Sequence, residues 1–529
     1  MLTRRALMMT ATATPFLSYA GEGEAATPRD VVVVGMAIDD IVSLDPAQSF
    51  EFSGAEMIGN AYERLVIPGL ENPNVIQGQL AESWSVSADG LTFTFRLVAG
   101  RKFASGKPIT AEDAAFSLQR AVKLNKSPAF IINQFGFTRD NVEERIKAID
   151  PLNLSLTIAD RVAPTFFLYC LTANVGSVVE KAPVLANQKD GDLGNEWLKT
   201  TSAGSGPFVI RSWRASESVV LEANPNARMR VHPRRVLIRH IPDPSSQLLQ
   251  LRAGDIDIAR SLLPDQLRSA AADPNLRESG AARSYIMYLA MNQKDPNLSK
   301  PQVRQAIKWA IDYDGIQRNI VAMTHQVQQS FIPQGLPASI TDRPFTMDVA
   351  KARALLAEAG VSNLEFTLDH GSSQPVPDIA QAVQANLAAV GIKVNLISAE
   401  ARAVLTKYRA RQHQLVIQAW GIDYFDPHTN AETFCINADN SDDARAKTLA
   451  WRNAWVDEDL TRRAQDAVRE SDAEKREAMY VSMQRDHHQR SPFALMFQSF
   501  ERAIYRKEVA GFAVAPMSAR TTFENVTKS

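Results

Sequence analysis

Two neighbouring stretches decide the fold: Leu80-Ala81-Glu82-Ser83-Trp84, and Asp89-Gly90-Leu91-Thr92-Phe93-Thr94-Phe95-Arg96-Leu97. Apolar and polar residues alternate from Leu91 to Leu97, and successive side chains of a strand point to opposite faces. The alternation therefore predicts a strand with one buried face and one solvated face. Just beyond it, Thr110-Ala111-Glu112-Asp113 has the composition of a capping box and predicts a helix start ahead of the apolar run 114–122.

Strands and helices alternate along the rest of the chain. Apolar runs predict strands at 31–34, 219–221, 236–241, 256–258, 364–368 and 392–397, and helical spacing predicts helices at 246–253, 301–311, 347–359 and 379–390. Gly254, Gly360 and Gly391 follow three of these helices, where glycine commonly ends a helix. The alternation indicates the α/β class, with helices covering mixed sheets.

The N-terminus predicts export. Arg4 and Arg5 precede an apolar stretch, 6–20, that ends in small residues, so residues 1–26 are interpreted as a signal peptide of the twin-arginine or the general secretory kind. No cysteine follows this stretch before Cys170, which excludes a lipid anchor there, and we expect a released periplasmic protein. Cys170 and Cys435 are the two cysteines of the chain, and the sequence leaves open whether they pair.

Composition sets limits on size and partners. The 529 residues are enough for about three average domains. A formal net charge of −1 gives no electrostatic reason to expect nucleic acid or anionic lipid as a partner.

Motifs from one end of the chain to the other resemble, in order, those of the family 5 extracellular solute-binding proteins, the peptide-binding family. The match runs from about Val31 to beyond Phe497. It includes Leu44-Asp45-Pro46, Tyr62-Glu63-Arg64-Leu65, the stretches within 80–113 quoted above, Gly204-Ser205-Gly206-Pro207-Phe208, Ala253-Gly254-Asp255-Ile256-Asp257, Val303-Arg304-Gln305-Ala306, Gly391-Ile392-Lys393-Val394 and residues 420–427.

The resemblance implies a two-lobed fold of the large peptide-binding type. Residues 27–68, 205–283 and 499–529 would form the core of a discontinuous first lobe, 69–204 an inserted subdomain, and 284–498 the second lobe. Two chain crossings near Ser284 and Ser499 would form the hinge. Such a hinge lets the lobes rotate and bury a ligand between them.

The resemblance also implies a function: a periplasmic substrate-binding protein of an ABC importer. It would capture a peptide or related solute, amine-bearing or cationic, and deliver it to a permease and ATPase, as a monomer and without a cofactor. One alternative is the same fold binding an opine, oligosaccharide, metal chelate or haem. Another is a periplasmic hydrolase, although no nucleophile or metal constellation stands out in the sequence.

Six residues are expected to contact the ligand: Asp423, Trp420, Tyr424, Phe50, Phe52 and Ser53. By resemblance, Asp423 would hold the α-ammonium of a peptide, which suits a carboxylate because charge-assisted hydrogen bonds are strong. The alternative is an aspartate that only forms a turn. Trp420 would supply an apolar wall or be an ordinary buried aromatic. Residues 50–53 would line the cleft or form a surface loop with two partly exposed rings.

Two further observations bear on chemistry. Dipeptide receptors of this family carry an arginine that clamps the ligand carboxylate, whereas the matching neighbourhood here is Pro375-Val376-Pro377-Asp378, with only His370 as a nearby basic residue. We therefore expect weak binding of simple dipeptides and better binding of longer peptides or cationic solutes. His487 and His488 are adjacent, so they cannot form the i, i+4 metal-binding face of a zinc hydrolase, and we expect them to be solvated.

Overall fold

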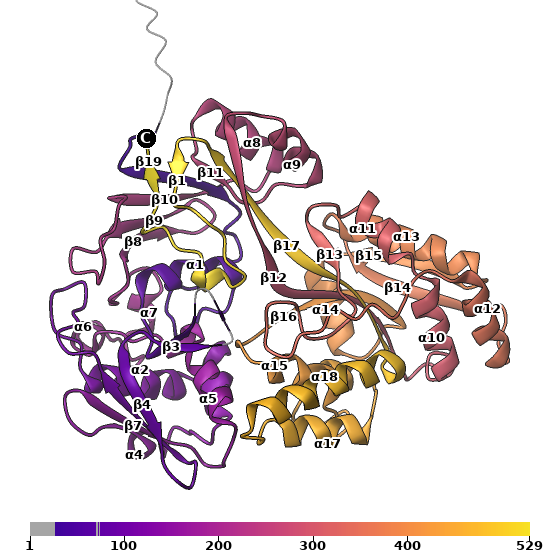
Figure 1. Ribbon diagram of the computed structural model, residues 1–529, viewed down its shortest axis with the longest axis horizontal. Helices are drawn as coiled ribbons and strands as arrows, with labels where there is room; N and C mark the ends of the chain where they lie inside the picture. Colours follow the sequence, from indigo (N-terminus) through magenta and orange to yellow (C-terminus); the bar gives the residue numbers. More distant parts are fainter. Residues whose placement is uncertain (1–26, 70–71, 74) are drawn as a thin grey trace, which may run out of the picture.

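One large mixed sheet runs through the molecule (Figure 1). The computed structural model describes residues 27–69, 72–73 and 75–529, so the predicted signal peptide lies outside the described residues. Within this part of the chain, ten strands pair in one path and β13 (His325–Val327) pairs with β17. Their order is β15 (Lys393–Ala399), β14 (Glu365–Gly371), β16 (Leu415–Gly421), β12 (Leu276–Met291), β17 (Phe493–Arg506), β11 (Ile258–Ala259), β1 (Val31–Met36), β10 (Arg235–His240), β9 (Ser218–Ala223) and β8 (Phe208–Arg214).

Smaller sheets and the helices surround this sheet. A four-stranded sheet consists of β4 (Ala81–Val86), β5 (Thr92–Leu97), β7 (Asn153–Thr157) and β6 (Ile146–Ala148), and two pairs join β2 (Val66–Pro68) to β3 (Ile76–Gly78) and β18 (Val509–Ala510) to β19 (Thr527–Lys528). The helices are α1 (Phe52–Ala61), α2 (Ala111–Leu124), α3 (Phe130–Asn133), α4 (Val142–Arg145), α5 (Pro164–Leu171), α6 (Lys181–Ala186), α7 (Asn195–Leu198), α8 (Pro244–Ala253), α9 (Pro264–Ala271), α10 (Pro301–Ala310), α11 (Tyr313–Asn319), α12 (Val349–Glu358), α13 (Val376–Ala389), α14 (Ala401–Arg409), α15 (His428–Cys435), α16 (Leu449–Arg452), α17 (Glu458–Ala467) and α18 (Ala473–Arg490), with short 3-10 turns η1 (Ser127–Ala129), η2 (Asn174–Gly176) and η3 (Ser518–Arg520).

The long strands β12 and β17 connect the two halves of the molecule (Figure 1). They pair antiparallel, but three residues, 283–285, lie opposite the single residue Ser499, because Ala282 pairs with Phe500 and Ile286 with Gln498. An irregularity of this kind bends a strand and increases its twist. The predicted crossings at Ser284 and Ser499 fall at this point, and the lobe boundaries drawn from them remain our proposal.

The central strands are buried on both faces. In β12, Met287, Leu289 and Met291 pack with α10, α12 and α13, whereas Ile286, Tyr288 and Ala290 pack with α15, α17 and α18. Burial on both faces also explains the valine run of β1, because strands covered by helices on both sides are apolar at every position.

The stretch that decided the fold behaves as predicted. Phe93, Phe95 and Leu97 of β5 are buried, whereas the side chain of Arg96 is exposed. At the start of α2, the Asp113 N–H donates to Thr110 Oγ1, and the Thr110 N–H donates to Asp113 Oδ2 (3.1 Å). The predicted capping box is therefore confirmed.

One expectation about the histidine pair is wrong. His487 and His488 are 1% and 5% exposed rather than solvated, because other core side chains cover this part of α18, including Phe345 beside the His488 ring. The His487 ring lies among the rings of Phe331, Phe434, Trp455 and Phe493, so it serves as an aromatic core side chain.

Two other expectations are settled by local geometry. The strand predicted at 256–258 begins only at Ile258, and Asp257 lies beside the middle of β1, where its carboxylate accepts the Val33 N–H (2.8 Å). Cys170 and Cys435 are buried free thiols and do not pair.

None of the helices in the described part of the chain combines the length and the apolarity needed to cross a bilayer.

Candidate ligand-binding site

A cavity with about 850 Å³ of empty space, part of which is open to solvent, lies where the two halves of the molecule meet. Its lining comes from five parts of the chain: the loop into α1 and its first turns (Ser49, Phe50, Glu51, Phe52, Ala55), the inserted segment (Pro128, Ile131, Thr172, Ala173, Asn174, Val175), β12 at its irregularity (Arg283, Ser284, Tyr285), the loop after β16 (Ile422, Asp423, Tyr424, Phe425) and the C-terminal segment (Pro516, Met517, Ser518, Ala519).

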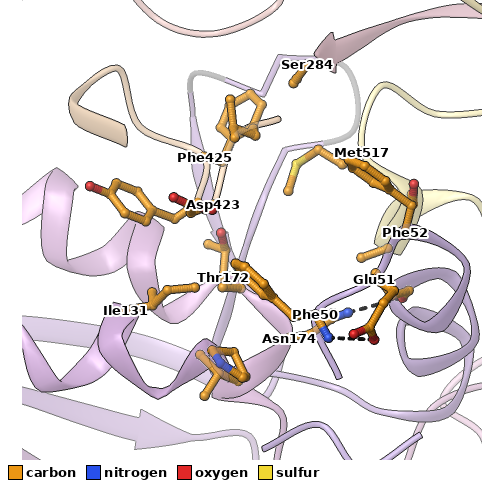
Figure 2. Close-up of a pocket in the computed structure, with 18 of the residues that line it drawn as sticks. Phe50, Glu51, Phe52, Ile131, Thr172, Asn174, Ser284, Asp423, Phe425 and Met517 are labelled. Atoms are coloured by element: carbon orange, nitrogen blue, oxygen red, sulfur yellow. Dashed lines mark hydrogen bonds between the residues drawn. The ribbon is translucent and has the colours of Figure 1, made fainter. Parts of the chain in front are cut away.

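Asp423 is held in place by its backbone rather than by its carboxylate. It lies two residues beyond the end of β16, and its N–H donates to Thr429 Oγ1 (3.0 Å) near the start of α15. Within the described residues no hydrogen bond or ion pair reaches the carboxylate, which lies at the cavity wall (Figure 2). The side chain is therefore placed to accept donors from a ligand, and it does not form the turn hydrogen bond of the alternative interpretation.

The surroundings of Asp423 oppose its negative charge. Burial and then the nearby Glu432 carboxylate raise the pKa of Asp423 to about 7, although Arg452 acts in the opposite direction. Glu432 accepts a hydrogen bond from the Tyr424 hydroxyl (3.4 Å), and burial raises the pKa of Glu432 as well. A cation bound beside Asp423 would lower the pKa of that carboxyl again, because an opposite charge favours the ionised form.

Aromatic rings form the opposite wall. Phe50 and Phe52 are 43% and 47% exposed, and Figure 2 shows them with Glu51 across the cavity from Asp423. The Phe52 ring meets the ring of Tyr285 edge to face, with centroids 5.8 Å apart. These contacts leave large apolar surfaces facing the cavity, so apolar parts of a ligand would gain free energy by displacing water there.

The charge of the lining is negative. Arg283 is the one cationic side chain among the described lining residues, and its Nε donates to Glu501 Oε2 (2.5 Å) while its guanidinium lies 5.5 Å from the centroid of the Phe52 ring. Neither Asp378 nor His370 lines the cavity. A ligand carboxylate would therefore meet no cation that is not already paired.

The structure brings four of the six predicted residues to the cavity: Phe50, Phe52, Asp423 and Tyr424. Ser53 lies outside the lining, since its hydroxyl is directed to the Ala37 carbonyl (3.4 Å). Trp420 also lies outside it: this residue of β16 packs toward the helices of the second half, 5.7 Å from the Arg452 guanidinium. The contacts of all six residues with a ligand remain predictions.

Several lining residues were not predicted. Ile131, Thr172 and Asn174 belong to the inserted segment, and Met517 belongs to a C-terminal segment of little regular structure. No sequence pattern distinguishes these residues from ordinary core or loop positions, so only the folded chain reveals them.

The two halves also touch beside the cavity. On α5 of the inserted segment, the Phe166 ring lies 5.7 Å from the ring of Tyr424 and 5.3 Å from that of His428. Tyr169 contacts Phe425 in the same way (5.6 Å). The cavity is thus bounded on one side by direct contact between segments far apart in the sequence.

A cavity enclosed between two halves that two long strands connect is the architecture of a two-lobed solute-binding protein. The model of the bacterial extracellular solute-binding proteins, family 5, matches residues 75–442, and the chain belongs to this family. The protein is a periplasmic substrate-binding protein of the kind that serves ABC importers, and it is not an enzyme.

Individual relatives agree in length and fold. The chain is 28% identical over 499 residues to the probable D,D-dipeptide-binding periplasmic protein DdpA of Escherichia coli K12, covering 93% of both chains. It is 30% identical over 476 residues to di/tripeptide-binding protein 4 of Pseudomonas aeruginosa UCBPP-PA14, covering 84% of this chain and 85% of the relative. The structure of the periplasmic binding protein DppA from Helicobacter pylori in complex with the peptide STSA superposes with a TM-score of 0.77 at 24% identity, covering 94% of this chain and 98% of that one.

Proposed function

We propose that this protein captures a short peptide, or a related solute with a free amine, and holds the ammonium on Asp423. The observation that carries this proposal is the Asp423 carboxylate, which lies at the wall of the cavity and forms no ion pair within the part of the chain that the structure describes. An ammonium group would donate several charge-assisted hydrogen bonds to it, each worth about 1.5–3 kcal/mol where water is excluded. The names of the relatives, which are dipeptide-binding and di/tripeptide-binding proteins, support a peptide.

The other end of the ligand is bound differently. Because Arg283 is already paired with Glu501, a buried peptide carboxylate would lose its hydration without gaining a free cation. Longer peptides, whose carboxyl end stays in water, are therefore better ligands than simple dipeptides. Binding closes the two lobes by bending at residues 283–285 and Ser499, and the closed monomer delivers the ligand to a permease driven by an ATPase.

The first test compares free and acetylated amino termini. Asp423→Asn should weaken calorimetric binding of trialanine amide by about 2–5 kcal/mol, since a buried ammonium then lacks its partner. The N-acetylated peptide should bind the wild-type protein weakly, and Asp423→Asn should change that affinity little. Asp439→Asn, which removes a carboxylate from an exposed turn outside the cavity, is the matched control.

A second measurement identifies natural ligands: mass spectrometry of small molecules released from protein purified from its own periplasm should detect amine-bearing peptides. If Asp423→Asn binds the free-amine peptide as tightly as the wild-type protein does, the ammonium assignment is wrong.

A further inference from the structure

Glu51 is a second carboxylate at the cavity without a paired cation among the described residues. It immediately precedes α1, and its Oε2 accepts the N–H of Phe50 (3.1 Å). No ion pair involves Glu51 within the described residues, whereas the carboxylates behind the cavity wall are neutralised: Glu56 pairs with Arg260, and Glu501 with Arg260 and Arg283. The negative charge of Glu51 is thus left to face the cavity.

The groups around Glu51 suit the side chain of lysine or arginine. The exposed rings of Phe50 and Phe52 flank it, and the Phe52 ring already has the Arg283 guanidinium 5.5 Å from its centroid. An alkylammonium or guanidinium of a ligand would be attracted both to the Phe50 ring and to the Glu51 carboxylate. Ile131 and Met517 provide apolar surface in the same cavity, on which the methylene stem of a basic side chain can lie while its charged tip reaches Glu51.

We propose that Glu51 is a second cation subsite, and that the preferred substrates are peptides with a basic side chain close to a free amino terminus. This inference rests on the proposed function, because it assigns the amino terminus to Asp423. A neutral apolar side chain would cover Glu51 without pairing it, and removing water from an unpaired charge costs free energy. A lysine or arginine removes that cost by supplying the opposite charge.

The positions of the two carboxylates connect this selectivity to lobe closure. Glu51 comes from the first segment of the chain and Asp423 from the loop after β16, and they lie on opposite sides of the cavity in Figure 2. A ligand with two cationic groups can therefore bind both halves at once. A ligand with one cationic group leaves one of the two carboxylates unpaired.

The test uses three tripeptide amides with a free amino terminus, in which lysine occupies the first, second or third position among alanines. Three matched peptides carry norleucine, which keeps the stem and removes the charge. Calorimetry at low ionic strength gives the lysine-to-norleucine affinity ratio for the wild-type protein, Glu51→Gln and Asp423→Asn. Glu144→Gln, the same change on an exposed residue outside the cavity, is the control.

We expect the wild-type protein to prefer lysine over norleucine by at least about tenfold at one position or more. Glu51→Gln should abolish this preference, because it weakens lysine binding and also removes the free-energy cost of covering an unpaired charge with norleucine, while Glu144→Gln retains the preference. If lysine and norleucine peptides bind equally at all three positions, or if the preference survives Glu51→Gln, the second subsite is contradicted. If none of the six peptides binds, or Asp423→Asn weakens none of them, the proposed function itself fails.

Discussion

At the scale of single residues, Asp423 combines a functional position with an unfavourable charge. Its pKa of about 7 in the folded protein lies above its ordinary value of 3.8, so the folded state holds the proton more tightly than the unfolded state does. The free energy of unfolding therefore falls as pH rises from about 4 toward 7. This cost is inherent in placing an unpaired carboxylate where a cation will bind.

This cost can be measured in the ligand-free protein. Asp423→Asn keeps the size of the side chain and removes its charge, so the variant should be more stable than the wild-type protein at pH 8. The gain should be larger at pH 8 than at pH 5 by about 1–2 kcal/mol, with the shift discounted because the side chain is partly exposed. Urea unfolding at the two pH values measures it, and a variant that is no more stable at pH 8 than at pH 5, relative to the wild-type protein, would contradict the raised pKa.

His487 shows the opposite case, a titratable ring used as a core aromatic. Neither ring nitrogen has a hydrogen-bond partner among the described residues, and the ring stacks on Phe493 with an interplanar angle of 14°. Burial holds its pKa well below 6.5. The neutral ring therefore contributes stability above about pH 6.5, which is lost as pH falls because only the unfolded state takes up the proton readily.

His487→Phe should stabilise the protein, since it retains the ring and removes two polar atoms that lack partners. The expected gain at pH 7 is about 1–2 kcal/mol, and it should increase at pH 5, where the wild-type histidine is protonated on unfolding. Thermal or urea unfolding at both pH values tests this. A decrease in stability at pH 5 would show that the buried ring makes polar contacts that phenylalanine cannot replace.

At the scale of elements, the sequence predicted most of what is local. The helices ending at Gly254, Gly360 and Gly391 and the capping box at Thr110 follow from chain neighbours, and the structure has them within a few residues of the predicted positions. Periodicity failed where a tertiary contact decides the outcome. The Asp257 side chain accepts the Val33 N–H of β1, a contact that its sequence neighbours do not reveal. The polar composition of α18 likewise concealed how deeply its two histidines are buried.

The residues of the candidate site also fall into those that a local sequence motif predicted and those that only the folded chain brings together. The loop carrying Asp423 was found because its motif is compact, with Trp420 and Pro427 close by in the sequence. The contributions of Ile131, Thr172 and Met517 come from elements that meet only after the inserted segment and the C-terminal segment have folded around the cavity. The placement of Trp420 shows a further limit, since sequence proximity to the site does not determine which face of β16 a side chain occupies.

At the scale of the whole molecule, the arrangement of contacts favours a hinge. The main sheet is continuous through β12 and β17, and its pairing is irregular at 283–285, beside the cavity. Other contacts between the halves lie beside the cavity, where α5 meets residues 424–428 and the Ala163 N–H donates to the Val468 carbonyl (2.9 Å), and near β17, where the Arg502 side chain donates to the Met323 carbonyl (2.6 Å). Opening the lobes would break the α5 contacts while leaving most of the sheet intact. Ligand binding and the α5 contacts would therefore stabilise the same closed form, although they share few atoms.

This coupling predicts that Phe166→Ala weakens ligand binding from outside the cavity. Phe166 does not line the cavity, but its ring bridges the inserted segment to Tyr424 and His428, so its loss should shift the ligand-free population toward open forms. We expect a larger radius of gyration by small-angle scattering and an affinity for the tripeptide amide about 3–10-fold lower, because part of the binding free energy then closes the lobes. Saturating peptide should restore the wild-type radius. Phe135→Ala is the control, since Phe135 packs on Phe166 and Phe167 inside the inserted segment. Equal effects of the two substitutions on radius and affinity would mean that Phe166 acts only through the stability of that segment, and closure would then depend on the ligand alone.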